Sequence, residues 1–237
     1  MRLERLIAER SALSRSDARA AIRRGRVAVD GQRCRKPGAR VGPDAVVELD
    51  GTPLVEAPLL AVLHKPVGVQ CVVGDPHGRP DLRSVGAALL ERGLHPVGRL
   101  DADTSGLLPW SREGGLTQRL LHPRHAVEKT YLATVAGDPP SDLARRLGQG
   151  VEMALGVHTA TLQQVRGRTI LLTVTEGKHR MVRRMLANLG LPVEALHRRR
   201  FGALELGDLA TGAWRAATDA ERAWAEDLQR GAPDTAS

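Results

Sequence analysis

Residues 98–108 read GRLDADTSGLL, in which an acidic hexapeptide runs directly into an apolar pair. Asp, Thr, Ser and Gly are common turn residues, and the apolar Leu107 and Leu108 favour a buried strand, so the stretch predicts a turn that opens onto a strand. A carboxylate at such a junction loses part of its water shell, and a partly desolvated carboxylate is a stronger base or nucleophile than a solvated one. Asp101 is therefore the candidate catalytic residue.

Two other interpretations of the hexapeptide compete with a catalytic one. The first is a solvated structural turn, which is ordinary for these residue types. The second is a calcium loop, because Asp101, Asp103 and Ser105 begin the pattern D-x-D-x-S-G of an EF-hand. That loop needs a glutamate at its twelfth position, where this chain has Arg112, and its ninth position is Pro109. The calcium interpretation is disfavoured, and the hexapeptide alone leaves the structural turn open.

Further segments on both sides of this stretch make the region from Leu59 to about Ala220 resemble the pseudouridine synthases of the RsuA/RluB type. The resemblance rests on LHKPVGV (63–69), DPHGRPDL (75–82), GRLDADTSGLL (98–108), HP (122–123), EKTYL (128–132) and GKHRMVRRM (177–185). Because these segments occur in the order of the family, together they are far more specific than any one of them.

The resemblance implies isomerisation of a specific uridine to pseudouridine in RNA, with ribosomal RNA as the expected partner. In this reaction the base is detached from its N1 bond, turned and reattached through C5, and Asp101 is the essential carboxylate. Whether Asp101 attacks the sugar, attacks the base or removes a sugar proton is left open by the sequence. The nucleotide has to be flipped out of its helix, at a cost of roughly a few kcal/mol.

Tyr131 is the second candidate catalytic residue. It is the only tyrosine of a chain in which aromatic residues make up 2%, and it lies inside the EKTYL segment. A flipped uracil needs a flat surface on which to stack, and a phenol adds a polar group that can accept or relay a proton. A buried core tyrosine is the alternative, and the neighbouring motifs favour the stacking role.

Arg183 is the third candidate, because it falls at the place where the family has a basic residue that pairs with the catalytic aspartate. A guanidinium there is expected to keep Asp101 ionised and to orient it. The alternative is that Arg183 contacts only phosphate. Arg99, next to the candidate catalytic residue, is expected to help extrude the base or to contact its phosphates.

The charge of the chain also favours an RNA partner. The formal net charge is +8 and the sequence pI is about 10.6, values that favour a polyanionic ligand. Residues 1–50 contain 12 Arg and Lys against 7 Asp and Glu, and residues 178–200 contain seven against the single acid Glu194. The positive charge is therefore gathered in two patches. In the second patch we expect phosphate contacts from Lys178, Arg180, Arg184, Arg198, Arg199 and Arg200.

The first 51 residues predict a helix pair followed by a small sheet. Apolar residues between 3 and 7 recur at helical spacing, and a second helix is expected from Ser16, as N-cap, to a stop at Gly25. Val27 and Val29 alternate with other residues in a short strand that ends at Asp30-Gly31, and residues 45–49 form a second short strand that ends at Asp50-Gly51. Both dipeptides are favoured in hairpin turns.

This first region resembles the RNA-binding domain named after ribosomal small-subunit protein four. In that family the second helix and the following hairpin present basic side chains to folded RNA. The residues in those places here are Arg15, Arg19, Arg23, Arg24 and Arg26. A basic helix that is merely solvated is the alternative.

The rest of the chain predicts a second, larger domain. Residues 52–58 (TPLVEAP) hold two prolines and are interpreted as a linker, residues 59–228 as the catalytic domain and residues 229–237 as a disordered tail. The expected elements are strands over 59–62 and 169–174 and helices over 83–90, 142–147 and 181–189. Because these do not alternate regularly, we expect an α+β fold with a mixed, largely antiparallel sheet flanked by helices.

Neither a metal nor an organic cofactor is expected, because the sequence has no ligand cluster and no glycine-rich phosphate loop. Cys34 and Cys71 lie too far apart for a metal pair and form no disulfide framework. The first ten residues, MRLERLIAER, lack the apolar stretch of a signal peptide, and no run approaches the roughly 20 residues of a membrane span. We expect a soluble, cytoplasmic monomer.

Two functions remain open from the sequence. One is an RNA-modifying isomerase, and the other is a non-catalytic RNA-binding or ribosome-assembly factor with the same fold. Retention of Asp101, Tyr131 and Arg183 favours the enzyme. Met181 and the pair Pro109-Trp110 depart from the usual family pattern, so the choice of substrate is left undetermined.

Overall fold

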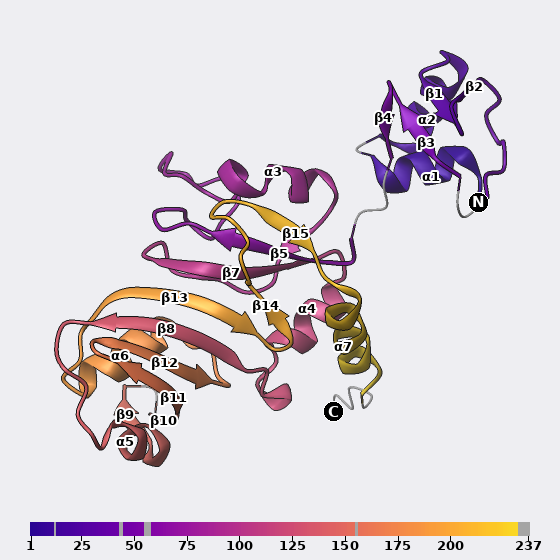
Figure 1. Cartoon of the computed structure of the whole chain (residues 1–237). Helices are drawn as coiled ribbons and strands as arrows, with labels where there is room; N and C mark the ends of the chain where they lie inside the picture. The colour runs from indigo at the N-terminus through magenta and orange to yellow at the C-terminus, as the bar shows by residue number, and fades with distance from the viewer. Residues whose placement is uncertain (12, 43–44, 55–57, 155, 232–237) are drawn as a thin grey trace. The chain divides into compact units, whose positions relative to one another are not determined.

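The computed structural model describes residues 1–11, 13–42, 45–54, 58–154 and 156–231. The chain divides into two compact units, the first formed mainly by Met1–Pro58 and the second mainly by the residues that follow (Figure 1). Each unit has its own apolar core and is described by itself.

The first unit is a helix pair on a small antiparallel sheet, as the sequence predicts. Its elements are α1 (Leu3–Arg10), α2 (Arg15–Arg23), β1 (Val27–Val29), β2 (Gln32–Cys34), β3 (Val47–Leu49) and β4 (Thr52–Pro53), with strand order β2-β1-β3-β4. The core packs Leu3, Leu6 and Ile7 of α1 against Ile22 of α2. The predicted turn at Asp30-Gly31 is confirmed, because both residues have the positive φ (50° and 74°) that a two-residue hairpin turn of type I′ requires.

Two details of this unit differ from the sequence-based expectation. The second helix begins at Arg15, and its N-cap is Ser14, whose Oγ accepts the Asp17 amide at 3.1 Å. Ser16, the predicted cap, lies within the first turn of this helix, and its hydroxyl is 2.7 Å from the hydroxyl of Ser14. The second difference is that Thr52–Pro53, assigned to the linker, forms β4; a proline is tolerated there because β4 is an edge strand. Residues 55–57 of the linker lie outside the described residues.

The second unit is built on a mixed, largely antiparallel sheet, which confirms the predicted fold class. The strands are β5 (Leu60–Lys65), β6 (His95–Pro96), β7 (Thr104–Ser111), β8 (Lys129–Val135), β11 (Thr161–Arg166), β12 (Thr169–Val174), β13 (Val193–Phe201), β14 (Leu204–Glu205) and β15 (Trp214–Ala216). Their order is β11-β12-β8-β13-β7-β5-β15, and β13 with β7 is the parallel pair of that path. A separate hairpin pairs β9 (Val151–Met153) with β10 (Gly156–His158).

Helices cover the two halves of this sheet and bury two apolar clusters (Figure 1). They are α3 (Arg83–Glu91), α4 (Gly114–Leu121), the 3₁₀ turn η1 (Pro123–His125), α5 (Leu143–Gln149), α6 (Met181–Asn188) and α7 (Asp219–Arg230). Leu172 of β12 packs with Met185 of α6 in one cluster, and Leu107 of β7 packs with Leu120 of α4 in the other. Because α7 extends to Arg230, residues 229–230 are helical where a tail was expected, and residues 232–237 lie outside the described part.

The two halves of the sheet meet where β13 runs parallel to the start of β7. This pairing places Gly106 beside Arg198, at a φ of 108°. A Cβ on Gly106 would lie 2.3 Å from the Arg198 carbonyl oxygen, so only glycine fits at this crossing. The acidic turn that precedes Gly106 is thereby held at the junction of the two halves. In the part of the chain described above, no helix has the length and apolarity that crossing a membrane would require.

Candidate active site

A cavity of about 680 Å³ opens in the second unit at the junction of the two half-sheets. Its lining includes Asp101 from the acidic turn, Tyr131 from β8, Arg180 from the start of α6 and Arg198 from β13. The fold thus brings the acidic turn, the EKTYL segment and the basic segment to one place, although they are far apart in the sequence. The volume of the cavity lies in the range that is usual for small-molecule sites.

Asp101 stands at the cavity with its side chain 27% exposed. Its backbone is fixed, because its carbonyl accepts the Thr104 amide at 3.0 Å. Lys65, fully buried beside the turn, donates from Nζ to the carbonyl oxygens of Pro66 (2.9 Å) and Thr104 (3.0 Å). Lys65, the last residue of β5, therefore holds the acidic turn in position, and the carboxylate of Asp101 is partly desolvated.

The predicted ion pair between Arg183 and Asp101 is not formed. Arg183 Nη2 donates to the Asp103 carbonyl at 2.7 Å, its Nη1 donates to the Val193 carbonyl at 3.0 Å, and its Nε lies 3.4 Å from the Asp103 carboxylate. These groups hold the guanidinium of Arg183. The cation that pairs with Asp101 is Arg180, whose Nη1 lies 4.0 Å from Asp101 Oδ2. Arg180 was expected to contact phosphate only.

Asp103 binds Arg180, the N-cap residue of α6, and Arg183 of α6. Arg180 donates to both carboxylate oxygens, at 3.1 and 2.7 Å. Partial burial by itself would raise the pKa of Asp103, but the Arg180 hydrogen bond and the charges of Arg183 and Arg180 outweigh it, so this pKa lies below its ordinary value. Arg180 itself has a left-handed backbone, with φ of 53°, a strained conformation for a residue with a Cβ.

Tyr131 is half-buried on β8 and lines the cavity. Its register partner on β13 is Arg198, whose Nη1 lies 3.5 Å from the phenol oxygen. Arg198, which was expected to contact phosphate, is 3% exposed, and its Nε donates to the Leu107 carbonyl at 2.7 Å, so this residue lies in the wall of the cavity and not on the outer surface. The pairing of β13 with both β7 and β8 encloses this side chain between the strands.

Lys129 is a cavity residue that was not among the residues predicted from the sequence. It is 7% exposed, its Nζ donates to the Thr175 carbonyl at 2.8 Å, and it lies 5.5 Å from the ring centre of Phe201. Burial lowers the pKa of Lys129 to about 8; the charge of Arg198 acts in the same direction and that of Glu176 opposes it. The signal that could have found it is its place in the EKTYL segment, two residues before the predicted tyrosine.

The other predicted RNA-binding residues of this unit are exposed. They are Arg99, Lys178, Arg184, Arg199 and Arg200. Of these, Lys178 lies 3.5 Å from Glu176 and Arg200 lies 3.9 Å from Glu205. Across the described ranges no group of three or more His, Cys, Asp or Glu side chains has a metal-binding arrangement.

In the first unit, all five predicted RNA-binding arginines are exposed. Arg19 lies 3.7 Å from Glu4, and Arg26 forms an ion pair of 2.5 Å with Asp50. Arg15, Arg23 and Arg24 form no ion pair within the described part of the chain, so their charges are available to an external anion.

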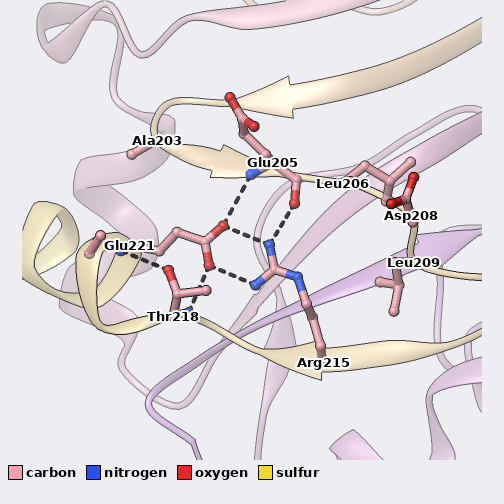
Figure 2. A pocket seen from close by; sticks show the side chains of 10 residues that line it. Ala203, Glu205, Leu206, Asp208, Leu209, Arg215, Thr218 and Glu221 are labelled. Atoms are coloured by element: carbon pink, nitrogen blue, oxygen red, sulfur yellow. Dashed lines mark hydrogen bonds and ion pairs between the residues drawn. The ribbon is translucent and has the colours of Figure 1, made fainter.

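A second hollow of the larger unit, about 460 Å³, is lined by an ion pair between the partly exposed Arg215 and the buried Glu221 (Figure 2). Arg215 donates to both oxygens of Glu221 at 2.7 Å, and Glu221 also accepts the amides of Thr218 (2.8 Å) and Glu205 (3.1 Å). Partial burial would raise the pKa of Glu221, but the hydrogen bonds from Arg215, Thr218 and Glu205 lower it to about 2. These groups are paired within the protein, and the ion pair together with the capping box of Thr218 and Glu221 stabilises the start of α7.

Asp103→Asn should reduce the rate of the reaction at this site by about tenfold, or ~1.4 kcal/mol. Without the Asp103 carboxylate, Arg180 is free to move onto Asp101 and to make it a weaker base or nucleophile. Single-turnover kinetics measures this effect. The double variant Asp103→Asn/Arg180→Gln should recover most of the rate, because no free guanidinium remains to pair with Asp101; if the two substitutions are simply additive, this account of Asp103 is wrong.

Comparison with known proteins finds matches to both units of the chain. The family model for RNA pseudouridylate synthase matches residues 59–188, and the model for the S4 domain matches residues 1–47. The ribosomal small subunit pseudouridine synthase A of Escherichia coli K12 is 36% identical over 227 residues, covering 93% of this chain and 98% of that protein. An uncharacterised RNA pseudouridine synthase of Mycobacterium leprae is 42% identical, covering 91% of this chain and 88% of that protein.

A solved structure described as a pseudouridylate synthase has the same fold, with a TM-score of 0.64 and 29% identity, covering 96% of this chain and 99% of that one. This chain belongs to the RNA pseudouridine synthase family. Within that family it is an RsuA-like enzyme, with an S4 RNA-binding domain at its N-terminal end.

Proposed function

We propose that this enzyme isomerises a specific uridine of ribosomal RNA to pseudouridine, with Asp101 as the essential carboxylate. The observation that carries the proposal is a partly desolvated carboxylate at the edge of a cavity of about 680 Å³ that also contains Tyr131. The ribosomal target is supported by the 36% identity to an enzyme that is named for the ribosomal small subunit.

The geometry supports a division of roles in the cavity. A flipped uracil stacks on the ring of Tyr131, and its sugar is presented to Asp101 of the acidic turn, which lines the same cavity. Asp103, bound by Arg180 and Arg183, holds the acidic turn and leaves the Asp101 carboxylate without a short ion pair. A carboxylate in this state keeps its reactivity as a base or nucleophile.

Binding of the surrounding RNA is assigned to the exposed cations. Arg99 precedes Asp101 by two residues and lines the same cavity, where it can contact the phosphates of the flipped nucleotide. Lys178 lines the same cavity, and Arg184, Arg199 and Arg200 are exposed on the neighbouring α6 and β13. Phosphate contacts of this kind offset the few kcal/mol that extrusion of the base costs. The S4 domain adds a second basic surface.

Mapping of pseudouridines in ribosomal RNA tests the proposal. Cells that lack the gene should lose pseudouridine at one ribosomal position, and expression of the wild-type protein should restore it. Expression of Asp101→Asn at an equal level should not. An unchanged ribosomal pseudouridine map in the deletion strain contradicts the ribosomal target, whereas restoration by Asp101→Asn contradicts the role of the carboxylate and favours a non-catalytic RNA-binding factor.

A further inference from the structure

Two cations, Lys129 and Arg198, are buried at the cavity, and neither forms an ion pair with a carboxylate in the described structure. Both line the cavity, with exposures of 7% and 3%. Each is held by a neutral carbonyl, that of Thr175 for Lys129 and that of Leu107 for Arg198. The Nη2 of Arg198 is buried without a hydrogen-bond partner.

This arrangement is unfavourable in the protein by itself. Burying a positive charge without a paired anion costs several kcal/mol, and two such charges near each other add their repulsion. The low pKa of Lys129, about 8, results from this burial and from the charge of Arg198. The two cations also share one aromatic neighbour, since the Phe201 ring lies 5.5 Å from the Lys129 ammonium and 5.2 Å from the Arg198 guanidinium carbon. The ring supports both cations but does not neutralise them, so the site is electrostatically prepared for an anion.

The reaction of the proposed function supplies such an anion. When the N1–C1′ bond breaks heterolytically, its electron pair stays on the base, and the detached uracil carries a negative charge spread over N1, O2 and O4. The base then turns, a C5–C1′ bond forms, the C5 proton leaves and N1 takes up a proton, so that product and substrate are isomers. Between cleavage of the N1–C1′ bond and formation of the C5–C1′ bond, the base is an anion that has to turn without leaving the cavity.

We propose that Lys129 and Arg198 stabilise the negative charge of the detached uracil. The inference rests on the proposed function of the cavity and assigns the two residues to one step of it. A pair of charges suits this step better than fixed hydrogen bonds to one edge of the ring, because electrostatic attraction changes little as the ring turns, whereas directed hydrogen bonds oppose the turn. Preorganised charges that act on a group only when it becomes anionic lower the barrier and not merely the substrate Kd.

The first test is a binding measurement that does not depend on activity or on the identity of the RNA. Its probes are 5-nitrouracil, whose nitro group makes the ring an anion at neutral pH, and uracil, which is neutral. By NMR titration, the wild-type protein should bind the nitrouracil anion at least about tenfold more tightly than uracil. Lys129→Met should abolish this preference, and Lys129→Arg should keep it. Lys36→Met, at an exposed lysine of the first unit, removes the same charge as a control.

The pH dependence of this preference separates a charge effect from a packing effect. Lys129 is charged below its pKa of about 8, so the wild-type affinity for 5-nitrouracil should fall as the pH rises through about 8. The charged groups that act on Lys129 are Arg198, which lowers its pKa, and Glu176, which raises it. Lys129→Arg should show no such fall, because arginine stays charged. Equal affinity of the wild-type protein for the two bases, or an unchanged preference in Lys129→Met, overturns the proposal.

Single-turnover kinetics on the substrate RNA then measures the effect on the reaction. At saturating enzyme, Lys129→Met should lower the rate of pseudouridine formation by about 100-fold, and Lys129→Arg should restore at least about a tenth of the wild-type rate. Lys129→Gln and Arg198→Met serve as further variants if Lys129→Met does not fold. If ribosomal RNA proves not to be the substrate, the wild-type protein is inactive on it, and the nitrouracil preference still decides the role of Lys129.

Discussion

Asp101→Asn should abolish pseudouridine formation, a loss of at least about 10⁴-fold of the kind seen when a reactive group is removed from a preorganised site. Asparagine has nearly the same shape as aspartate, and the turn is fixed by backbone bonds, including Thr104 N to the Asp101 carbonyl, which the substitution leaves in place. The neutral amide can act neither as a base nor as a nucleophile. RNA affinity should stay within about threefold of wild type, because the exposed cations that are assigned to phosphate are unchanged.

The measurement is product formation per enzyme at saturating concentration, combined with a filter-binding assay on the same RNA. Asp138→Asn, at an aspartate outside the cavity, is the matched control and should retain full activity. Product formed by purified Asp101→Asn at more than a trace of the wild-type rate would show that another group supplies the essential carboxylate chemistry.

Substitution of Arg15, Arg23 and Arg24 by alanine should weaken binding to a long RNA and lower the log–log salt slope by roughly 2 to 3, at 0.7 to 0.9 for each phosphate that the protein no longer neutralises. These three side chains are exposed on or directly after α2 and have no ion pair within the described residues, whereas Arg19 and Arg26 face Glu4 and Asp50. The rate on RNA that is already bound should be unchanged, because the cavity belongs to the other unit.

A matched control removes the same charge elsewhere. The triple variant Arg145→Ala/Arg222→Ala/Arg230→Ala takes away three arginines of the second unit that are paired with neighbouring aspartates at the surface. It should change the salt slope by less than half as much. Equal slopes for the two triple variants would mean that net charge, and not the surface of the S4 domain, determines the affinity.

Local sequence was sufficient for the helix pair of the first unit, for several elements of the second and for the position of the acidic turn. The turn residues before Leu107 and Leu108 predict the junction where Asp101 lies, and β7 is buried over most of its length. The Asp-Gly dipeptide at 30–31 predicts a hairpin turn that the positive φ angles confirm. These features depend on interactions within a few residues, so a short window of sequence contains the information.

The identities of the ion pairs were decided by the tertiary structure. A guanidinium of α6 reaches the acidic turn only because α6 packs beside β13 and β13 pairs with β7, and this packing directs Arg183 to Asp103 and not to Asp101. Arg198 appears in the sequence as one of three adjacent basic residues, and only the enclosure of β13 between β7 and β8 shows that it is buried.

The burial of Lys129, like that of Arg198, could not be predicted from the sequence. A lysine next to a threonine and a tyrosine is ordinary in sequence, and its burial beside a second cation is created by strands β8, β12 and β13 together. The sequence by itself determined the fold class, the family and the position of the acidic turn, because turn chemistry, apolar patterning and motif order are local or ordered along the chain. Which charges are paired, which are buried and which face the cavity depends on distances between residues tens of positions apart in the chain, and only the packed sheet sets those distances.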